Sequence, residues 1–307
     1  MLRVALACLP GFAALTYFFG PGILLNLLLT LTSCLLAEAW VLKLRKRSLS
    51  VLKDNSALVT AVLLAACLPA SAPWWIPVLG SLFAILLTKQ LYGGLGQNPF
   101  NPAMAAYAFL LISFPVPMTQ WPLASLAAEA GWLNSLTSAA ALTSATPLDA
   151  FRNKGQLMAE EFWASNQLHP SQLTASTYIA LAWLVGGLYL TATRIINWQV
   201  PLAFFAGLAV FGLFLWGLNP SLYTPVWLHF MAGSAVFAGF FILTDPVSGA
   251  TSLKGRILFA VGAAILVISI RTWGNYPDGI AFSVLLMNFA APALDYFTRP
   301  RVYGHSK

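Results

Sequence analysis

Long apolar runs alternate with short polar breaks along most of the 307 residues. A helix needs about 20 residues to cross the hydrocarbon core of a membrane, and ten of these runs have that length or come near it. The pattern therefore predicts an all-α, polytopic membrane protein with about ten transmembrane helices. Their expected ranges are 3–19, 22–42, 56–72, 74–91, 102–118, 177–193, 199–217, 226–243, 256–273 and 279–296.

The composition agrees with this class. The chain is 59% hydrophobic and 8% charged, whereas about 25% of the residues in a soluble domain are charged. The net charge of +7 does not indicate nucleic-acid binding, because the basic residues stand in short loops, where they set the orientation of membrane helices. We expect membrane lipid, and no nucleic acid, around this chain.

The distribution of basic residues predicts that orientation. The cluster KLRKR, residues 43–47, follows the second apolar run and should be cytoplasmic. Counting spans from this cluster places both termini in the cytoplasm and one long polar loop, residues 119–176, outside. Twelve of the 16 basic residues then lie inside: Arg3, Lys43, Arg45, Lys46, Arg47, Lys53, Arg194, Lys254, Arg256, Arg299, Arg301 and Lys307.

Ten spans suggest two halves of five helices each. An odd number of spans per half forces the two halves into opposite orientations, which is the inverted-repeat plan of many transporters. In support, Lys89 and Arg271 are each followed by a break rich in Gly, Asn and Pro and then by another apolar run. The predicted domains are a first repeat, 1–118, an external loop, 119–176, and a second repeat, 177–307.

The densest group of helix breakers is KQLYGGLGQNPFNPA, residues 89–103. Its glycines and prolines end a helix. Irregular backbone at membrane depth is tolerated only where protein or a water-filled cavity satisfies its polar groups. Lys89, Asn98 and Asn101 could supply those partners or hold a ligand. Two alternatives stay open: a broken-helix site near the centre of the fold, which we favour, and a tight turn between two spanning helices.

Further ionisable residues stand near membrane depth, namely Asp245 in the segment Thr244–Pro246, and Arg271 with Asp278. Such groups are costly there and usually line a pathway or bind a ligand. For Asp245, the cap of a helix beginning at Pro246 is an equal alternative.

Three other charged residues have a simpler interpretation. For Glu38, Asp295 and Arg194 we favour snorkelling to the membrane interface or helix capping over a functional role.

Metal and hydrolytic sites have no support in the sequence. Cys8, Cys34 and Cys67 are isolated within apolar runs, and the three histidines show no metal-ligand spacing. The segment GGLG fails the GxGxxG pattern because Pro99 occupies the third glycine position. We therefore predict no metal site and no catalytic residue on this chain alone.

The external loop contains LTSATPLDAF, residues 142–151. Pro147 biases Thr146 toward an extended backbone, which projects its hydroxyl outward, where it is accessible to modification. The alternative is an ordinary turn before a helix capped near Asp149. The similar letters SGAT end at Thr251, but that loop also carries Lys254 and is predicted to be cytoplasmic.

Six segments in order resemble one family, the D subunit of the Rnf, or Rsx, ion-translocating electron-transport complex. More distantly, they resemble the B subunit of the sodium-translocating NADH:quinone reductase. The segments are LKDNSALVT (52–60), KQLYGGLGQNPFNPAM (89–104), SATPLDAF (144–151), FFILTDPVSGAT (240–251), the run that starts GNYPDGIAFSVLLMN (274–288) and DYFTRPRVYGH (295–305).

The resemblance implies two inverted five-helix repeats similar to urea and ammonium channels, and FMN joined to Thr146 through a phosphoester. It also implies a non-covalent riboflavin in the membrane region, without residues assigned to it. Lys89, Asn98, Asn101, Asp245 and Asp278 are our candidates for an ion path or for this second flavin pocket.

The implied protein is a multi-pass subunit of the bacterial inner, or cytoplasmic, membrane and belongs to a redox-driven sodium- or proton-translocating complex. It would transfer electrons between a partner flavin subunit and the NAD- or ferredoxin-linked subunits, and it would not be catalytic alone. The implied partners are the FMN-carrying G subunit and the membrane A and E subunits.

Two departures and one alternative accompany this expectation. The chain begins almost at its first span, where relatives usually carry a short cytosolic lead, which we expect to weaken docking to cytosolic partners. The external loop is also short. The alternative function is a channel or secondary transporter for a small solute, which would use the inverted repeats without a flavin.

Overall fold

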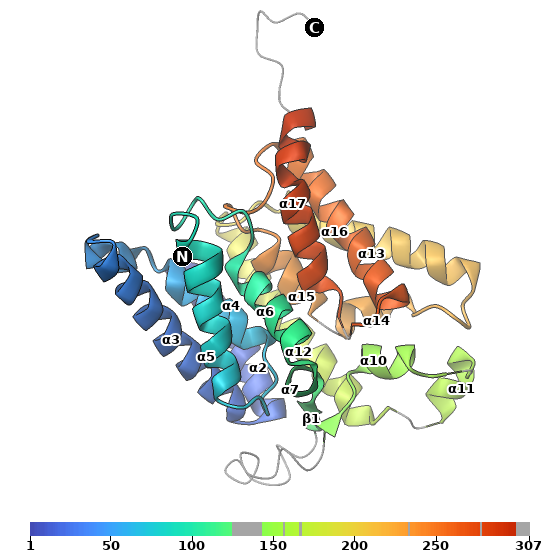
Figure 1. Cartoon of the computed structure of the whole chain (residues 1–307). Coiled ribbons are helices and arrows are strands. Elements are labelled where there is room, and N and C mark those ends of the chain that lie inside the picture. Colours follow the sequence, from blue (N-terminus) through green and yellow to red (C-terminus); the bar gives the residue numbers. More distant parts are fainter. Residues whose placement is uncertain (125–142, 156, 166–167, 233, 277, 299–307) are drawn as a thin grey trace, which may run out of the picture.

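The protein is described by a computed structural model, which covers all residues except 125–142, 156, 166–167, 233, 277 and 299–307. Within the described ranges the chain is predominantly helical, and its N-terminal and C-terminal parts form two adjoining groups of helices (Figure 1). Three basic residues discussed above, Arg299, Arg301 and Lys307, lie outside the described residues.

The first half of the chain forms helices that match the predicted spans in order. The elements are α1 (Leu2–Ala7), α2 (Leu9–Phe19), α3 (Gly22–Leu44), a 3₁₀-helix η1 (Leu49–Asp54), α4 (Ser56–Cys67), α5 (Trp75–Leu82), a π-helix η2 (Phe83–Gln90), α6 (Pro102–Ser113) and α7 (Pro115–Thr119).

A small region of mixed structure separates the two halves. A two-stranded antiparallel sheet pairs β1 (Trp121–Pro122) with β2 (Thr143–Ser144), which the all-α prediction did not include. Two short helices follow, α10 (Pro147–Arg152) and α11 (Ala159–Ala164). Both pack on the second half through a buried cluster formed by Leu148, Phe151, Phe162, Leu228 and Ala232.

The second half repeats the pattern of long helices with one broken element. Its elements are α12 (Pro170–Ala192), α13 (Gln199–Leu218), α14 (Val226–Met231), α15 (Ala235–Phe237), a π-helix η3 (Ala238–Ile242), α16 (Leu253–Trp273) and α17 (Ile280–Thr298).

Among the described residues, six helical stretches are long and apolar enough to cross a membrane: Leu2–Phe19, α3, α12, α13, α16 and α17. The other four predicted spans correspond to shorter or broken helices. These are α4, α5 with η2, α6, and α14 with α15 and η3. The multi-pass membrane class is therefore established by length and composition, while the ten-span inverted repeat stays a prediction.

Local chemistry explains where the helices next to the site begin. The Asn101 side chain accepts hydrogen bonds from the backbone N–H groups of Ala103 and Met104, and Pro102 occupies the first position of α6. Just before it, Gly93, Gly94 and Gly96 adopt positive φ angles of 120°, 109° and 88°. Only glycine adopts such angles without strain, so the segment turns sharply between η2 and α6.

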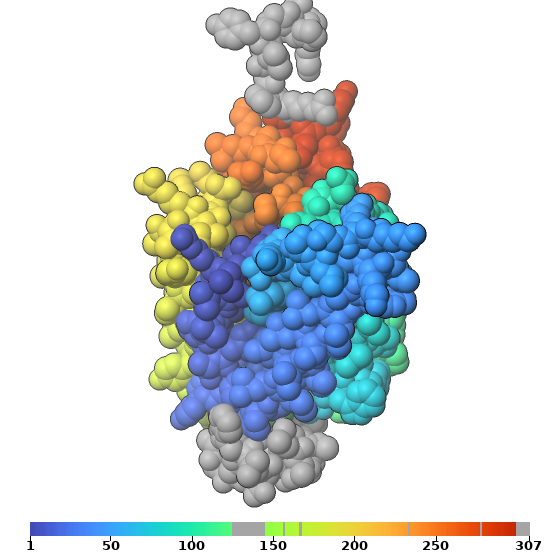
Figure 2. Space-filling view, turned by 90° about the vertical axis from the view of Figure 1, so that its left-hand side faces the viewer, coloured from blue at the N-terminus to red at the C-terminus, as the bar shows by residue number. Residues whose placement is uncertain are grey.

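The two groups of helices share one apolar core. Helix α2 approaches α12 so closely that a Cβ added to Gly11 would lie 2.4 Å from the Trp183 ring. The same ring contacts Phe12 and Phe237, with centroid distances of 6.0 Å and 4.5 Å. In Figure 2 the N-terminal helices, in blue, lie directly beside the yellow part of the second half. Figure 1 shows the C-terminal ends of α3 and α17 on the side opposite β1 and α10.

Candidate functional site

Two cavities lie at opposite ends of the same helices. One, the Asn101 cavity, is lined by residues that include Val4, Ser56 and Leu190 and has a volume of about 360 Å³. The other, the Thr146 cavity, is lined by residues that include Phe19 and Cys67 and has a volume of about 150 Å³. Because α1–α2, α4 and α12 each line one cavity near one end and the other cavity toward the other end, these helices span the distance between the cavities. Helix α6 lines both cavities within its first two turns.

Four of the predicted site residues line the Asn101 cavity: Lys89, Asn98, Asn101 and Asp245. The Asn101 amide donates to the Asp245 carboxylate over 3.4 Å. Asn98 is 5% exposed, and its side-chain oxygen is buried without a hydrogen-bond partner among the described residues. An unsatisfied buried acceptor is costly, which makes this oxygen a candidate contact for a ligand.

Asp245 caps a turn and not a helix, because no helix begins at Pro246; the next one is α16, from Leu253. Its carboxylate accepts from the Val247 backbone N–H at 3.1 Å and from the Ser248 hydroxyl at 2.7 Å. These bonds cap the turn that follows η3. The same carboxylate lines the cavity and contacts Asn101, so it also belongs to the ligand-facing wall.

Both π-helices end at this cavity, although they come from different halves of the chain. Segment η2 contains Lys89, and η3 ends two residues before Thr244, which lines the cavity. The wider π-turn is rare and occurs most often at functional sites. The Asn101 cavity is therefore bounded by irregular backbone on two sides.

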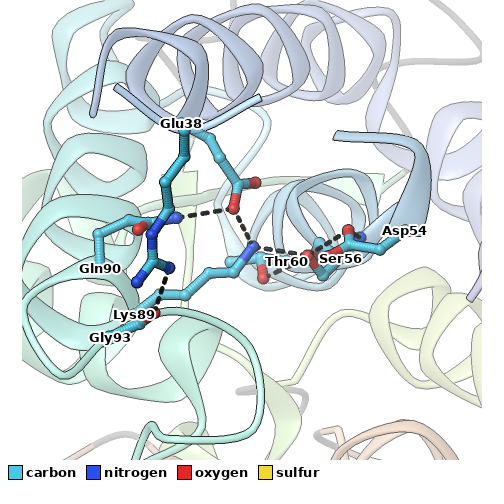
Figure 3. A network of polar contacts seen from close by, with 8 residues as sticks. Glu38, Asp54, Ser56, Thr60, Lys89, Gln90 and Gly93 are labelled. Carbon is cyan, nitrogen blue, oxygen red and sulfur yellow. Dashed lines mark hydrogen bonds and ion pairs between the residues drawn. The ribbon is translucent and has the colours of Figure 1, made fainter. Parts of the chain in front are cut away.

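Lys89 is held by a network of buried polar contacts (Figure 3). Its ammonium group lies 2.6 Å from the Glu38 carboxylate and 2.6 Å from the Ser56 hydroxyl. Gln90 donates to the same Glu38 oxygen at 2.9 Å. Asp54 in turn accepts from the Ser56 backbone N–H and hydroxyl at 2.7 Å and 2.6 Å, fixing the start of α4.

The expectation that Glu38 snorkels to the interface was wrong. Glu38 is 1% exposed and is ion-paired with Lys89, from which it is separated by 51 residues in sequence. An isolated charge at this depth would be very costly, so the two residues are buried together. The capping interpretation of Asp295 was right, because its carboxylate accepts from the backbone N–H groups of Thr251 and Ser252.

Asp278 is separate from the other candidates and lines the Thr146 cavity. One carboxylate oxygen accepts from Arg271 at 3.0 Å, and the other accepts from the Ser234 hydroxyl at 3.0 Å. Arg271 also donates to the backbone carbonyl of His229, in the last turn of α14. The ion pair therefore joins the two sides of the break between α14 and α15, supplying partners for backbone groups that the break releases.

Thr146 stands at the start of α10, half-buried, with its side chain on the cavity wall. The hydroxyl accepts a long hydrogen bond of 3.3 Å from the Asp149 backbone N–H. Aromatic rings of Phe19, Tyr107 and Trp121 line the same cavity. The Thr146 hydroxyl is therefore weakly held and stands beside aromatic rings against which a planar group can pack.

Thr251 has different surroundings. It is exposed and lines the Asn101 cavity, at the opposite end of the helices from Thr146. The two threonines with similar flanking letters therefore belong to different cavities.

The sequence did not reveal how α10 is fixed. Arg152 donates to the Tyr276 backbone carbonyl at 2.6 Å, and Lys154 donates to the carbonyls of Ser221 and Leu222 at 2.7 Å and 3.1 Å. Burial lowers the pKa of the Lys154 ammonium group. These two residues hold the Thr146 helix to the loop between α16 and α17 and to the loop between α13 and α14. Their only sequence signal was that both are basic residues of the external loop.

Comparisons with known proteins show the family of this chain. Residues 1–304 match the NQR2, RnfD, RnfE family, so the chain belongs to that family of membrane proteins. The resemblance stated from the sequence motifs is thereby confirmed.

The named relatives are ion-translocating oxidoreductase complex subunits D. The chain is 48% identical to the subunit of Ectopseudomonas mendocina, and the match covers all of this chain and 92% of the relative. It is 46% identical to the subunits of Pseudomonas aeruginosa and Escherichia coli, with the whole chain matching 92% and 94% of those proteins.

Proposed function

We propose that this protein is the flavin-carrying D subunit of a redox-driven complex that translocates sodium ions or protons. The observation that carries the proposal is the Thr146 hydroxyl, which opens on an aromatic cavity in a chain that matches D subunits over its full length. The subunit acts within its complex and is not catalytic alone.

We assign FMN to Thr146. Its phosphate would form a phosphoester with the Thr146 oxygen, and its ring system would lie against Phe19, Tyr107 and Trp121. The flavin supplies electron acceptance and donation, while the protein sets its position and surroundings. Arg152 and Lys154 keep α10, and therefore the attachment point, fixed on the second half of the chain.

The Asn101 cavity is the better of the two positions for a non-covalent riboflavin. With about 360 Å³ it is the larger cavity, and its wall combines the Asn98, Asn101 and Asp245 side chains with Phe240 and Phe259. Amides and a carboxylate can pair with the polar edge of a flavin, while rings contact its faces. Lys89 also lines the cavity, where its charge is paired with the Glu38 carboxylate. An ion path through the same polar wall remains compatible with this arrangement.

The proposed orientation places the Asn101 cavity toward the cytoplasm and the Thr146 cavity outside, in a bacterial inner membrane. In that arrangement the described basic residues Arg45 and Arg194 follow the ends of α3 and α12 on the cytoplasmic side, and Arg256 lies in the first turn of α16 on the same side. The FMN-carrying G subunit would then bind on the outer side, at the Thr146 cavity. The membrane A and E subunits would contact the membrane-embedded faces of the helices.

The absorption spectrum of the purified protein tests this function. We expect a yellow protein that keeps a fluorescent flavin on its gel band after denaturation. The competing function, transport of a small solute, predicts a colourless protein that catalyses solute uptake in vesicles. Absence of flavin from protein purified from a host that contains the flavin-attaching machinery of the complex would overturn the proposal.

The second flavin gives a separate prediction. Replacing Asn98 with Leu should remove most of the non-covalent flavin, because the unpartnered amide oxygen on the cavity wall is lost. The covalent flavin at Thr146 should remain. Flavin released by acid, quantified against flavin kept on the protein, measures the two separately.

Asn219→Leu is the matched control, since Asn219 is exposed and does not line the Asn101 cavity. Equal amounts of released flavin from both variants and the unaltered protein would show that the Asn101 cavity holds no flavin.

A further inference from the structure

The Arg271–Asp278 pair has an asymmetric relation to the Thr146 cavity. Asp278 lines the cavity, together with its hydrogen-bond donor Ser234, whereas Arg271 lies behind the carboxylate and is not part of the wall. A group in the cavity therefore meets the negative partner first. The balance between the two charges decides the electrostatic potential at that position.

This balance is sensitive because the pair is poorly exposed to water. The side chains of Arg271 and Asp278 are 2% and 18% exposed. A charge in such surroundings is only weakly screened, so it acts on neighbouring charges more strongly than a surface charge does. The addition of an electron to a flavin adds one negative charge to the cavity. Asp278 repels this charge, and Arg271 attracts it.

We propose that the Arg271–Asp278 pair, with Ser234, sets the reduction potential of the group attached to Thr146. The inference rests on the proposed function, since it assumes a flavin at that threonine. Asp278 disfavours the added electron, and Arg271 and the Ser234 hydroxyl offset most of that effect. The three residues are positioning residues that act through charge and do not exchange electrons themselves.

The loop that carries Asp278 also contacts the helix that begins at Thr146. Arg152 of the Thr146 helix donates to Tyr276, two residues before Asp278, and also contacts the Asn275 side chain at 3.4 Å. The loop that carries Asp278 and the helix that begins at Thr146 are therefore held together. The distance between Asp278 and the group on Thr146 is therefore fixed. A constant electrostatic effect on the reduction potential requires such a fixed distance.

Spectroelectrochemical titration of the flavin absorbance in the purified protein tests the proposal. Asp278→Asn should move the midpoint potential to more positive values, and Arg271→Gln should move it to more negative values. We expect each shift to correspond to about tenfold in the one-electron reduction equilibrium, or about 59 mV. The titrations are run at alkaline pH, which keeps the unpaired carboxylate ionised.

Ser234→Ala provides a milder test that keeps both charges and the ion pair. Loss of the hydroxyl leaves more negative charge on Asp278, so the potential should become more negative by a smaller amount. If Arg271→Gln does not yield folded protein, the opposite signs of Asp278→Asn and Ser234→Ala decide the question, and Arg271→Lys should stay close to the unaltered protein.

Asp295→Asn is the matched control for the loss of one carboxylate. Asp295 stands 17 residues further along the chain, near the other end of α17 and about 25 Å away, and caps Thr251. Its replacement should leave the potential unchanged.

Fluorescence of the denatured band distinguishes a failure of the proposed function from a failure of the proposed role of the Arg271–Asp278 pair. If the unaltered protein carries no covalent flavin, the proposed function fails. If all variants carry the flavin but their potentials stay constant, or move in one direction, only the role of the pair is refuted.

Discussion

Replacing Thr146 with Ala should abolish the flavin fluorescence of the denatured protein band, whereas Thr251→Ala should leave it intact. A phosphoester requires the side-chain oxygen that alanine lacks. Thr146 presents that oxygen to the Thr146 cavity in the proposed outer half, while Thr251 lines the Asn101 cavity at the opposite end of the helices. In-gel fluorescence after denaturing electrophoresis measures the effect, which we expect to be complete for Thr146.

The loss should not reflect unfolding. Thr146 caps α10 through a single bond of 3.3 Å, and removal of such a cap costs about 1 kcal/mol. Thr146→Ser keeps both a hydroxyl and the cap, so it serves as the matched control and should retain detectable flavin. A peptide map that finds the FMN mass on Thr251 would reject both the attachment site and the proposed orientation.

Much of the helix order could be predicted from the sequence, because spanning helices depend on long, local apolar runs. The ranges expected at 22–42, 199–217 and 256–273 agree closely with α3, α13 and α16. The ends of α4 and the break between α14 and α15 were harder to predict from the sequence. Their ends depend on distant partners such as Lys89 and Arg271, which no local pattern encodes.

The candidate site was predicted residue by residue but not as an arrangement. The sequence marked Asn98, Asn101 and Asp245 as polar residues beside helix breaks, and the structure brings them to one cavity. It also marked Asp278, which lies at the other cavity. Sequence spacing cannot distinguish these positions, because 144 residues separate Asn101 from its contact Asp245.

The surroundings of Lys89 and Arg271 can be compared with the predicted inverted repeat, which stays a prediction. Lys89 lies near the end of η2 and Arg271 in the last turn of α16, and each belongs to a buried ion pair. Lys89 contacts Ser56 at the start of α4, and Asp278, the partner of Arg271, contacts Ser234 just before α15. The two arrangements lie at opposite cavities, as an inverted repeat would require. They differ in one respect, because the carboxylate comes from the distant α3 in the first half and from the following loop in the second.

Breaking the Glu38–Lys89 pair should destabilise the protein strongly. Both side chains are 2% exposed, so Glu38→Gln leaves a buried ammonium without a compensating charge. Removal of one partner of a buried ion pair typically costs about 3–5 kcal/mol. We expect a decrease of that size in the free energy of unfolding in mixed detergent micelles, and a similar decrease for Lys89→Met.

The double variant distinguishes charge pairing from simple packing. When Glu38→Gln and Lys89→Met are combined, neither charge is left alone, so the double variant should be more stable than the sum of the two single effects predicts. Lys53→Met removes an exposed lysine and should change the stability by less than about 0.5 kcal/mol. Strict additivity of the two single variants would mean that the buried charges do not stabilise one another, and that the network around Ser56 holds α4 through its hydrogen bonds alone.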